Sequence, residues 1–553
     1  MNLRKNLLIA LLALFFCAVC PAATYYVAAG VASTNVGAAT SSSAPCNLNA
    51  AWDDMCAGTT IGTGDTIQLA DGTYNDTTND VPVAGLGDCA QNIDLTIQSK
   101  SGDPALCIID FSGNNANVDG FHITTTGTWT IKGLTIHGSD ATTGEGEITF
   151  IDGTLHVLNC IIYNDRIRGT YGVIVISTSA AAHGILYNSE IYDTADDGYT
   201  NAGTGGAAAD RIIEAHYCYF HDIDTASNTQ GMTNHNDSTA KAYFCRFKNI
   251  GLGHGTGSGN GAAIGSGSGS CPIYVDNCTI EDCFLGVGGT GAATVRNCTF
   301  MNIDTEAIVK SGDTADAIID SCLIWDAAIT TAVINVYSDS DITIKRCAIK
   351  SDTTFTGIST LDSGYNGAKS RIGKSLTVED CVIYTPAAQS IVTKHQTLNC
   401  RRNLLWGKEE TAGMLGLVHN YFDACDVNNV VMNIEHNCMN NTASGQPIIG
   451  TWGDTTSGAV TANVTSYIIG NTYSTGATLF KTENGTIAAG DLDQAATITW
   501  RGFTKEMMLS PNSVHYRDFG AAMMPGWYRP KGNQNMGTFC RRPIVPRESI
   551  YVD

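Results

Sequence analysis

Two neighbouring turns of the sequence are rich in aspartate and could supply oxygen ligands to a cation. Carboxylates that converge from adjacent turns can bind Ca²⁺ through hard oxygen ligands. Aspartate is also favoured in turns for structural reasons, because its side chain hydrogen-bonds to nearby backbone groups. We therefore predict a Ca²⁺ site, with ordinary solvated turns as the alternative, formed by Asp196, Asp197, Asp222 and Asp224.

Basic and titratable side chains lie in the same part of the chain, where they could move a proton. Such a group must come within hydrogen-bond reach of the reacting atom. A lysine on an exposed strand is usually only solvated, so a structural role is the alternative. The candidate catalytic residues are Lys310, His235, Lys241 and Arg246.

A strip of small residues with polar neighbours emerges when short apolar segments are aligned. The segments begin at residues 172, 197, 230, 261, 285, 306 and 331, and the middle of the strip is glycine-rich. We expect this strip to face solvent and to accommodate a sugar chain, whereas an asparagine ladder that stabilises turns is the alternative. Together with the insertion at 251–261, the strip gives the candidate substrate-binding residues Asn201, Asn234, His254 and Asn335.

A repeated pattern supplies the elements that would hold these residues. Short alternating strands rich in Ile, Val, Tyr and Phe are separated by Gly, Asn and Asp turns, with insertions of variable length. This pattern is typical of a solenoid, in which each turn stacks on the previous one and insertions point outward. Ser189 fills a gap in the column that the repeat aligns, which contains Cys160, Cys218, Cys245, Cys278, Cys298, Cys322, Cys347, Cys381 and Cys400.

We expect the aligned cysteines to point inward and to remain reduced. Stacked strands lie about 4.8 Å apart, which is slightly too far for relaxed disulfides between equivalent positions. Buried cysteine then acts as a small apolar side chain. Outside the column, the candidate disulfides of a secreted chain are Cys46–Cys56, Cys89–Cys107 and Cys425–Cys438, with Cys540 left over.

The repeats resemble those of a known superfamily. The strings "VDNCTIEDC", "VRNCTFMNI" and "IDSCLIWDA" look like the coils of right-handed parallel β-helix proteins, the pectin-lyase-like superfamily, and "TYYVAAG" with "GDTIQLADGTY" is similar to their N-terminal opening. The resemblance implies an all-β, right-handed parallel β-helix over residues 24–425. Leu48, Trp52 and Met55 share one helical face, which suits an N-terminal cap helix. Residues 426–553 are expected to form looser C-terminal coils and a capping tail.

The resemblance narrows the function only partly, because this fold carries lyases, hydrolases, esterases and adhesins. Many lyases of the fold use Ca²⁺ to neutralise a uronate carboxylate while Lys or Arg removes the C5 proton. The resemblance therefore implies a protein that binds an extracellular polysaccharide, with cleavage by lyase-type β-elimination as an activity left open. The alternative is a non-catalytic adhesin or structural protein of the cell envelope.

Charge and the N-terminal segment restrict location and partners. Residues 1–23 read as a secretory signal peptide, with a basic start, a short apolar run and small residues at its end. No other run is apolar enough to predict a membrane span. The formal net charge of the 553-residue chain is −22, which excludes a nucleic-acid binder that depends on clustered Lys and Arg. We expect a secreted or surface-located protein.

Overall fold

The computed structural model describes residues 22–489, apart from internal gaps. The gaps are 79, 83–85, 114–119, 125, 139–145, 165–171, 177–181, 195–196, 202–210, 224–228, 236–237, 253–260, 267–270, 311–314, 326–331, 337–338, 352–355, 361–370, 386, 409–416, 424–428, 436, 442–446, 455–461, 470–471, 474–477 and 484. The predicted signal peptide and the residues after 489 therefore fall largely or wholly outside the description.

The strands form three long parallel sheets, of 17, 15 and 15 strands. Sheet A contains β1 (Thr24–Val27), β2 (Asp65–Leu69), β5 (Leu95–Ser99), β8 (Thr128–Lys132), β11 (Thr154–Leu158), β14 (His183–Tyr187), β17 (Ile212–His216), β20 (Thr239–Tyr243), β23 (Ile273–Asp276), β26 (Ala293–Arg296), β29 (Ala317–Asp320), β32 (Ile342–Lys345), β35 (Arg371–Glu379), β38 (His395–Arg401), β41 (Asn429–Glu435), β44 (Ala462–Ile469) and β47 (Gly485–Ala489).

Sheet B follows sheet A in each coil. Its strands are β3 (Gly72–Tyr74), β6 (Cys107–Asp110), β9 (Thr135–His137), β12 (Ile161–Asn164), β15 (Glu190–Thr194), β18 (Tyr219–Ile223), β21 (Arg246–Ile250), β24 (Thr279–Cys283), β27 (Thr299–Ile303), β30 (Leu323–Trp325), β33 (Ala348–Lys350), β36 (Val382–Thr385), β39 (Leu404–Gly407), β42 (Cys438–Asn441) and β45 (Thr472–Tyr473).

Sheet C completes the coil before the chain returns to sheet A. Its strands are β4 (Asp88–Cys89), β7 (Phe121–Ile123), β10 (Ile148–Phe150), β13 (Ile174–Ile176), β16 (Tyr199–Asn201), β19 (Met232–Asn234), β22 (Ala262–Ser266), β25 (Leu285–Gly289), β28 (Ile308–Lys310), β31 (Ala332–Val336), β34 (Thr356–Ser359), β37 (Ile391–Thr393), β40 (Val418–Asp423), β43 (Pro447–Asp454) and β46 (Thr478–Glu483).

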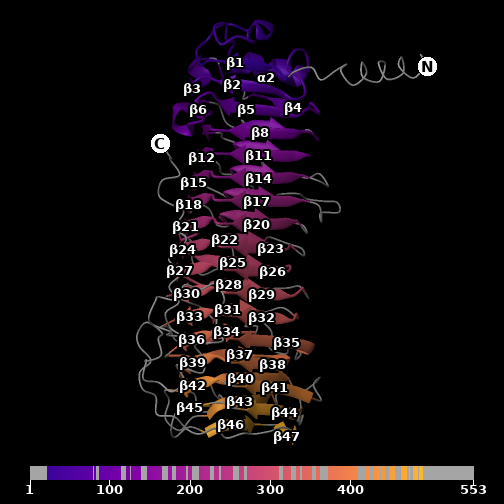
Figure 1. Cartoon of the computed structure of the whole chain (residues 1–553), viewed down its shortest axis with the longest axis vertical. Coiled ribbons are helices and arrows are strands. Elements are labelled where there is room, and N and C mark those ends of the chain that lie inside the picture. The colour runs from indigo at the N-terminus through magenta and orange to yellow at the C-terminus, as the bar shows by residue number, and fades with distance from the viewer. Residues whose placement is uncertain are drawn as a thin grey trace, which may run out of the picture.

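The chain is a right-handed parallel β-helix, as the repeats predict. Each coil from β2 to β46 gives one strand to each sheet, and β1 and β47 add one strand each to sheet A at the two ends. Strands of consecutive coils pair in parallel, as β14 does with β17 and β17 with β20. Figure 1 shows the coils stacked along the long axis from β1 to β47. The three sheets continue past residue 425 through β47 without a change of architecture.

The N-terminal end is covered by the predicted cap helix. Helix α2 (Leu48–Ala57) begins at the N-cap Asn47, whose side chain accepts the N–H of Ala50, and it buries Leu48, Trp52 and Met55. Three short 3₁₀ turns, η1 (Val36–Ala38), η2 (Asp76–Thr78) and η3 (Pro104–Leu106), lie in the first coils. None of the helices in the described ranges has the length and apolar character that a bilayer crossing requires.

The corner from sheet A to sheet B is a tight turn through one residue with positive φ. Asparagine suits this left-handed conformation, because its short polar side chain hydrogen-bonds locally. Asn188, for example, donates from Nδ2 to Oδ1 of Asn159 one coil earlier, at 3.0 Å. From β11 onward these corner residues, with φ between 48° and 58°, are Asn159, Asn188, Tyr217, Phe244, Asn277, Asn297, Ser321, Arg346, Asp380 and Arg402.

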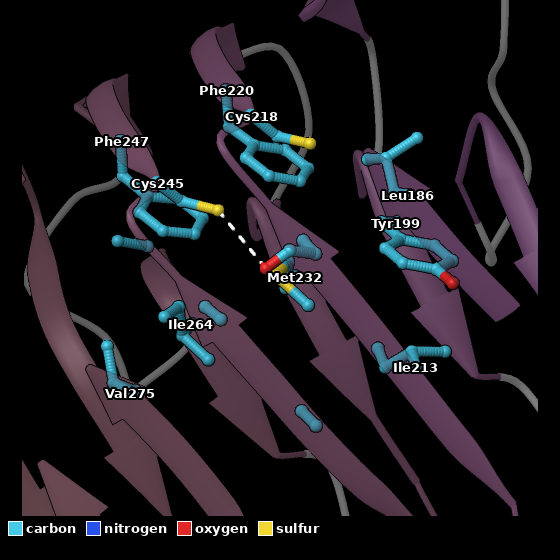
Figure 2. Packing of buried hydrophobic residues seen from close by; sticks show 14 of the residues in the cluster. Leu186, Tyr199, Ile213, Cys218, Phe220, Met232, Cys245, Phe247, Ile264 and Val275 are labelled. Atoms are coloured by element: carbon cyan, nitrogen blue, oxygen red, sulfur yellow. Dashed lines mark hydrogen bonds between the residues drawn. The ribbon is translucent and has the colours of Figure 1, made fainter. Parts of the chain in front are cut away.

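The residue after each corner points into the core, and the predicted cysteine column is confirmed from Cys160 to Cys381. These thiols are reduced and at most 2% exposed. Each polar ladder atom can accept a backbone N–H from the coil before, as Ser189 Oγ does from Cys160 N at 3.0 Å and Cys278 Sγ from Cys245 N at 3.4 Å. Figure 2 shows Cys218 and Cys245 beside Phe220 and Phe247, whose rings stack at 4.9 Å.

The assignment of Cys400 to the cysteine column is wrong, although its thiol is buried and reduced. Cys400 lies in β38 of sheet A, and Asn403 takes its expected place, accepting the N–H of Cys381 on Oδ1 at 2.8 Å. Cys400 fills an inward position of sheet A opposite Val378, three residues before the ladder position, so the recurrence of cysteine misleads there.

The pairs Cys46–Cys56 and Cys89–Cys107 are not formed, and all four thiols are free. Their members lie on different elements: Cys89 is in sheet C and Cys107 in sheet B. Cys425 and Cys540 lie outside the described residues, and the side chain of Cys438 is not described.

Candidate functional site

The predicted solvent-facing strip lies on sheet C, but its register differs by one residue from the sequence alignment. Asn201 pairs with Asn234 as expected, and Asn234 then pairs with Ser266 rather than with Gly265. Further along, Asn335 pairs with Val309, not with Lys310. Since a shift of one residue moves a side chain to the opposite face of a strand, the strip separates into two columns.

One column points inward, so the expectation that its polar residues face solvent is wrong. Asn201 and Asn234 are fully buried, and Lys310 is 1% exposed. They follow the core residues of the same strands by two positions, which places them on the same face. Asn234 Nδ2 donates to the carbonyl of Ser238 at 2.8 Å, and Lys310 Nζ donates to the carbonyl of Thr290 at 3.4 Å. These contacts hold turns together.

The other column does contain the predicted glycines. Gly265 pairs with Gly288, Gly288 with Val309 and Val309 with Asn335. Gly265 and Asn335 are buried, whereas Gly288 and Val309 are half-buried, so this column is not the continuous open groove that the sequence predicts.

Two aspartates of the predicted metal site, Asp197 and Asp222, lie in or next to different sheets, apart from the predicted catalytic His235. Asp197 precedes β16 of sheet C and accepts the N–H of Gln230 on Oδ1 at 2.8 Å. Asp222 lies in β18 of sheet B and binds Asn249 Nδ2 at 2.8 Å and His221 Nδ1 at 2.7 Å. Burial lowers the pKa of the imidazole of His235.

Within the described ranges, no three Cys, His, Asp or Glu side chains are grouped to hold a metal. The Ca²⁺ site stays a prediction, because two of its proposed ligands, Asp196 and Asp224, lie outside the described residues. The predicted substrate-binding residue His254 lies outside them as well.

The last two candidate bases lie on different outer faces. Arg246 is on sheet B, where Nε donates to Glu281 Oε1 at 2.9 Å and the guanidinium sits 5.1 Å from the ring centre of Tyr219. Lys241 is on the outer face of sheet A, with Nζ 3.4 Å from Oε2 of Glu214. Lys241 lies in a cluster of half-buried polar groups and exposed tyrosine rings.

We call this cluster the tyrosine–histidine patch. It covers the outer face of β14, β17, β20 and β23 and the adjoining corner. Register places Tyr187 beside His216 and His216 beside Tyr243, while Glu214 pairs with Lys241 and Lys241 with Tyr274. Its residues are His183, Tyr187, Glu214, His216, Tyr217, Lys241, Tyr243 and Tyr274.

Glu214 is the polar centre of the patch. Its Oε1 lies 2.6 Å from His216 Nε2, and its Oε2 lies 3.4 Å from Lys241 Nζ and 3.9 Å from His183 Nε2. Burial alone would raise the pKa of Glu214, but the hydrogen bond from His216 and the charge of Lys241 outweigh it and lower the pKa. Burial lowers the pKa of His183, more than Glu214 raises it.

Tyrosine rings surround this centre and are unusually open to solvent. Tyr187 is 46% exposed, Tyr217 43% and Tyr274 38%. The Tyr187 ring meets Tyr217 edge-on, with centroids 5.5 Å apart, and Tyr217 stacks on Phe244 at 5.0 Å. Large exposed rings gathered on one face are typical of binding surfaces.

Two corners at the edge of the patch, those after β17 and β20, lack the asparagine that this turn prefers. Tyr217 and Phe244 have φ of 55° and 57°, whereas the same corner is asparagine in four other coils. A bulky residue in the left-handed region costs about 1–2 kcal/mol relative to its preferred conformation. Unfavourable backbone conformations of this kind often mark functional positions.

Sequence reasoning missed this patch because it examined the strand after each cysteine. The signal was nevertheless present: "HYCYFH" at 216–221 places aromatic or imidazole rings on both sides of Cys218, and aromatic residues replace asparagine before Cys218 and Cys245.

Comparisons with known proteins concern the fold. No protein-family model matches the chain, and no curated protein matches it in sequence. Among solved structures, pectate lyase Pel9A is 16% identical, over 56% of this chain and 76% of that one, with a TM-score of 0.39. A rhamnogalacturonan lyase is 14% identical over 55% and 82%, with a TM-score of 0.38. A PL6 alginate lyase in complex with a trisaccharide is 10% identical over 84% and 88%, with a TM-score of 0.35.

Proposed function

We propose that this chain is an extracellular protein that binds polysaccharide on the tyrosine–histidine patch. The observation that carries the proposal is the set of exposed rings around one hydrogen-bonding centre: Tyr187, Tyr217 and Tyr274 surround Glu214 and Lys241. A sugar ring has apolar C–H faces, which pack on aromatic rings, and a rim of hydroxyls, which need polar partners.

The dimensions of the patch suit an extended chain of sugars. Tyr187 lies on β14 and Tyr274 on β23, which are separated by three steps between paired strands. At about 4.8 Å per step the separation along the solenoid axis is roughly 14 Å, and Tyr274 is also displaced by two residues along the strand direction, about 7 Å. A glycan that runs along the solenoid axis would therefore contact one open ring at each end and the polar centre between them.

Binding is the function that these contacts support best, with cleavage by β-elimination as a separate expectation. A base must reach the substrate and be able to accept its proton. Lys310 is buried. Lys241 forms an ion pair with Glu214, and Arg246 forms one with Glu281. A non-catalytic surface protein, the alternative function named above, fits these contacts.

A binding screen tests the proposal. Purified protein is titrated with a panel of soluble polysaccharides, and the Tyr187→Ala and Tyr274→Ala variants are compared with Ile318→Ala, an exposed residue on β29 of the same face. We expect each tyrosine variant to lose about tenfold in affinity, since burial of the ring and its stacking together contribute about 1.4 kcal/mol.

Ile318→Ala should bind normally. Equal affinity for all three variants, or no binding to any glycan, would refute the proposal. Ultraviolet absorbance of unsaturated product, with and without Ca²⁺, reports β-elimination in the same samples.

A further inference from the structure

We infer that the patch selects uncharged polysaccharide, an inference that rests on the proposed function and adds the chemical class of the ligand. The argument starts from the pair at its centre. Lys241 Nζ and Glu214 Oε2 lie 3.4 Å apart on neighbouring strands and present a donor beside an acceptor.

A hydroxyl group matches such a pair, and an anionic group does not. A hydroxyl can donate to a carboxylate and accept from an ammonium at the same time, whereas a carboxylate or sulfate can only accept. An acidic sugar approaching Lys241 would therefore be repelled by Glu214 or would have to displace it. A neutral sugar can insert its hydroxyls without breaking the charge balance.

The groups around the pair leave no surplus of positive charge at neutral pH. Burial lowers the pKa of His183 and of His156, which lies on the neighbouring strand β11. Glu214 balances Lys241, and Asp276 ends β23 next to Tyr274 and Tyr243. His216 lies against Glu214 at 2.6 Å.

The charge of the whole molecule acts in the same direction. A net charge of −22 repels polyanions at long range, particularly at low ionic strength. A polyanion-binding site on such a molecule would need a local cluster of unpaired cations, and the patch offers one lysine that is paired with a glutamate. Uncharged glycan avoids both penalties.

Matched probes distinguish the two ligand classes. Neutral probes are soluble β-glucan, xylan and mannan; acidic probes are polygalacturonate, alginate and chondroitin sulfate. We expect binding to a neutral probe, with affinity that changes by less than about twofold between low and high salt, because no ion pair is formed. Binding only to acidic probes, with affinity that falls steeply with salt, would overturn the inference while leaving the proposed function intact.

Glu214→Gln should change the affinity for neutral probes and for acidic probes in opposite directions. It keeps the shape of the side chain but removes the charged acceptor and releases Lys241. For a neutral probe we expect about tenfold weaker binding, since hydrogen bonds to a charged group contribute more than those to a neutral one. For an acidic probe the same variant should bind more tightly than wild type.

Lys241→Met is the matched variant on the cationic side and should also weaken neutral-probe binding. Thermal melting confirms that both variants fold. If Glu214→Gln binds the neutral probe as well as wild type does, the inference is wrong.

Discussion

The outer faces of sheets A and B carry two aromatic regions of similar composition, and only the region on sheet A contains rings that are largely exposed. On sheet B, His137, Tyr163, Tyr192 and His221 form what we call the histidine–tyrosine stack, with ring centres 4.6, 4.9 and 5.0 Å apart and planes within 20° of parallel. Each inner ring is covered on both sides by its neighbours, so the stack presents only ring edges to solvent.

The tyrosine–histidine patch on sheet A differs in how its rings are used. Tyr274 has no ring partner among the described residues, and Tyr187 meets Tyr217 edge-on instead of stacking. The comparison teaches that aromatic residues on a β-helix face serve two purposes. Rings in register that cover one another act as cross-strand pairs that stabilise the sheet, as His216 and Tyr243 do within the patch at 4.9 Å. The open rings of Tyr187 and Tyr274 are not explained by stability.

The largest expected effect on stability comes from removing a ring inside the stack. Tyr192→Ala deletes a ring between Tyr163 and His221, and we expect the free energy of unfolding to fall by about 2 kcal/mol from lost area and lost stacking. Chemical denaturation measures this change. Tyr274→Ala on the patch is the control and should unfold like wild type; equal losses for the two variants would contradict the comparison.

A smaller effect separates stability from binding at the corner. Tyr217→Asn places the preferred residue in the left-handed conformation, which should gain about 1 kcal/mol of stability. The variant also loses the stacking of Tyr217 on Phe244, which costs about 1 kcal/mol, so the two effects cancel. We therefore expect unchanged or slightly higher thermal stability together with about tenfold weaker glycan binding. Calorimetric melting and binding titration are done on the same sample. A variant that binds normally would remove Tyr217 from the site.

The smallest effects concern pH and have opposite signs on the two faces. Burial would lower the pKa of His221, but hydrogen bonds to Glu190 at 3.0 Å and Asp222 at 2.7 Å outweigh it and raise the pKa. Its contribution to stability is then fully present below the unfolded pKa of about 6.5 and is lost as pH rises through the higher folded pKa.

His183 behaves in the reverse way, because burial lowers its pKa and protonation below about pH 6.5 favours the unfolded chain. Relative to wild type, His221→Gln should therefore be less stable at acid pH and approach it as pH rises. The free energy of unfolding of His183→Gln should fall less at acid pH than that of wild type. Each difference should stay below about 1 kcal/mol, measured by denaturation between pH 5 and pH 8, and equal pH profiles for the two variants would contradict these assignments.

The fold could be predicted from the sequence because the residues of the cysteine column have the same surroundings in successive coils. Cys160 to Cys381 recur after a left-handed corner, and each points into the same core, so sequence similarity between repeats reports a structural position. The prediction failed at Cys400, which is a buried cysteine of sheet A, while Asn403 takes the ladder position three residues later.

The site could not be predicted in the same way, because strand orientation depends on a single residue of register. Asn201 and Thr200 are adjacent, and only the pairing of β16 with its neighbours decides which of them points inward. Three-residue strands such as Tyr199–Asn201 are buried throughout, so no alternation of polar and apolar residues marks the faces. The patch was missed because exposure, not residue type, distinguishes Tyr187 from Tyr192.

Glycan affinity, measured side by side for wild type, Tyr187→Ala and Tyr192→Ala, tests the central claim most directly. A neutral probe that binds wild type is titrated into each protein under conditions where melting shows all three to be folded. The account predicts that Tyr187→Ala loses about tenfold in affinity while Tyr192→Ala binds like wild type despite its lower stability. Loss of affinity in Tyr192→Ala with normal binding in Tyr187→Ala would contradict the assignment of the open patch as the binding surface and the stack as structural.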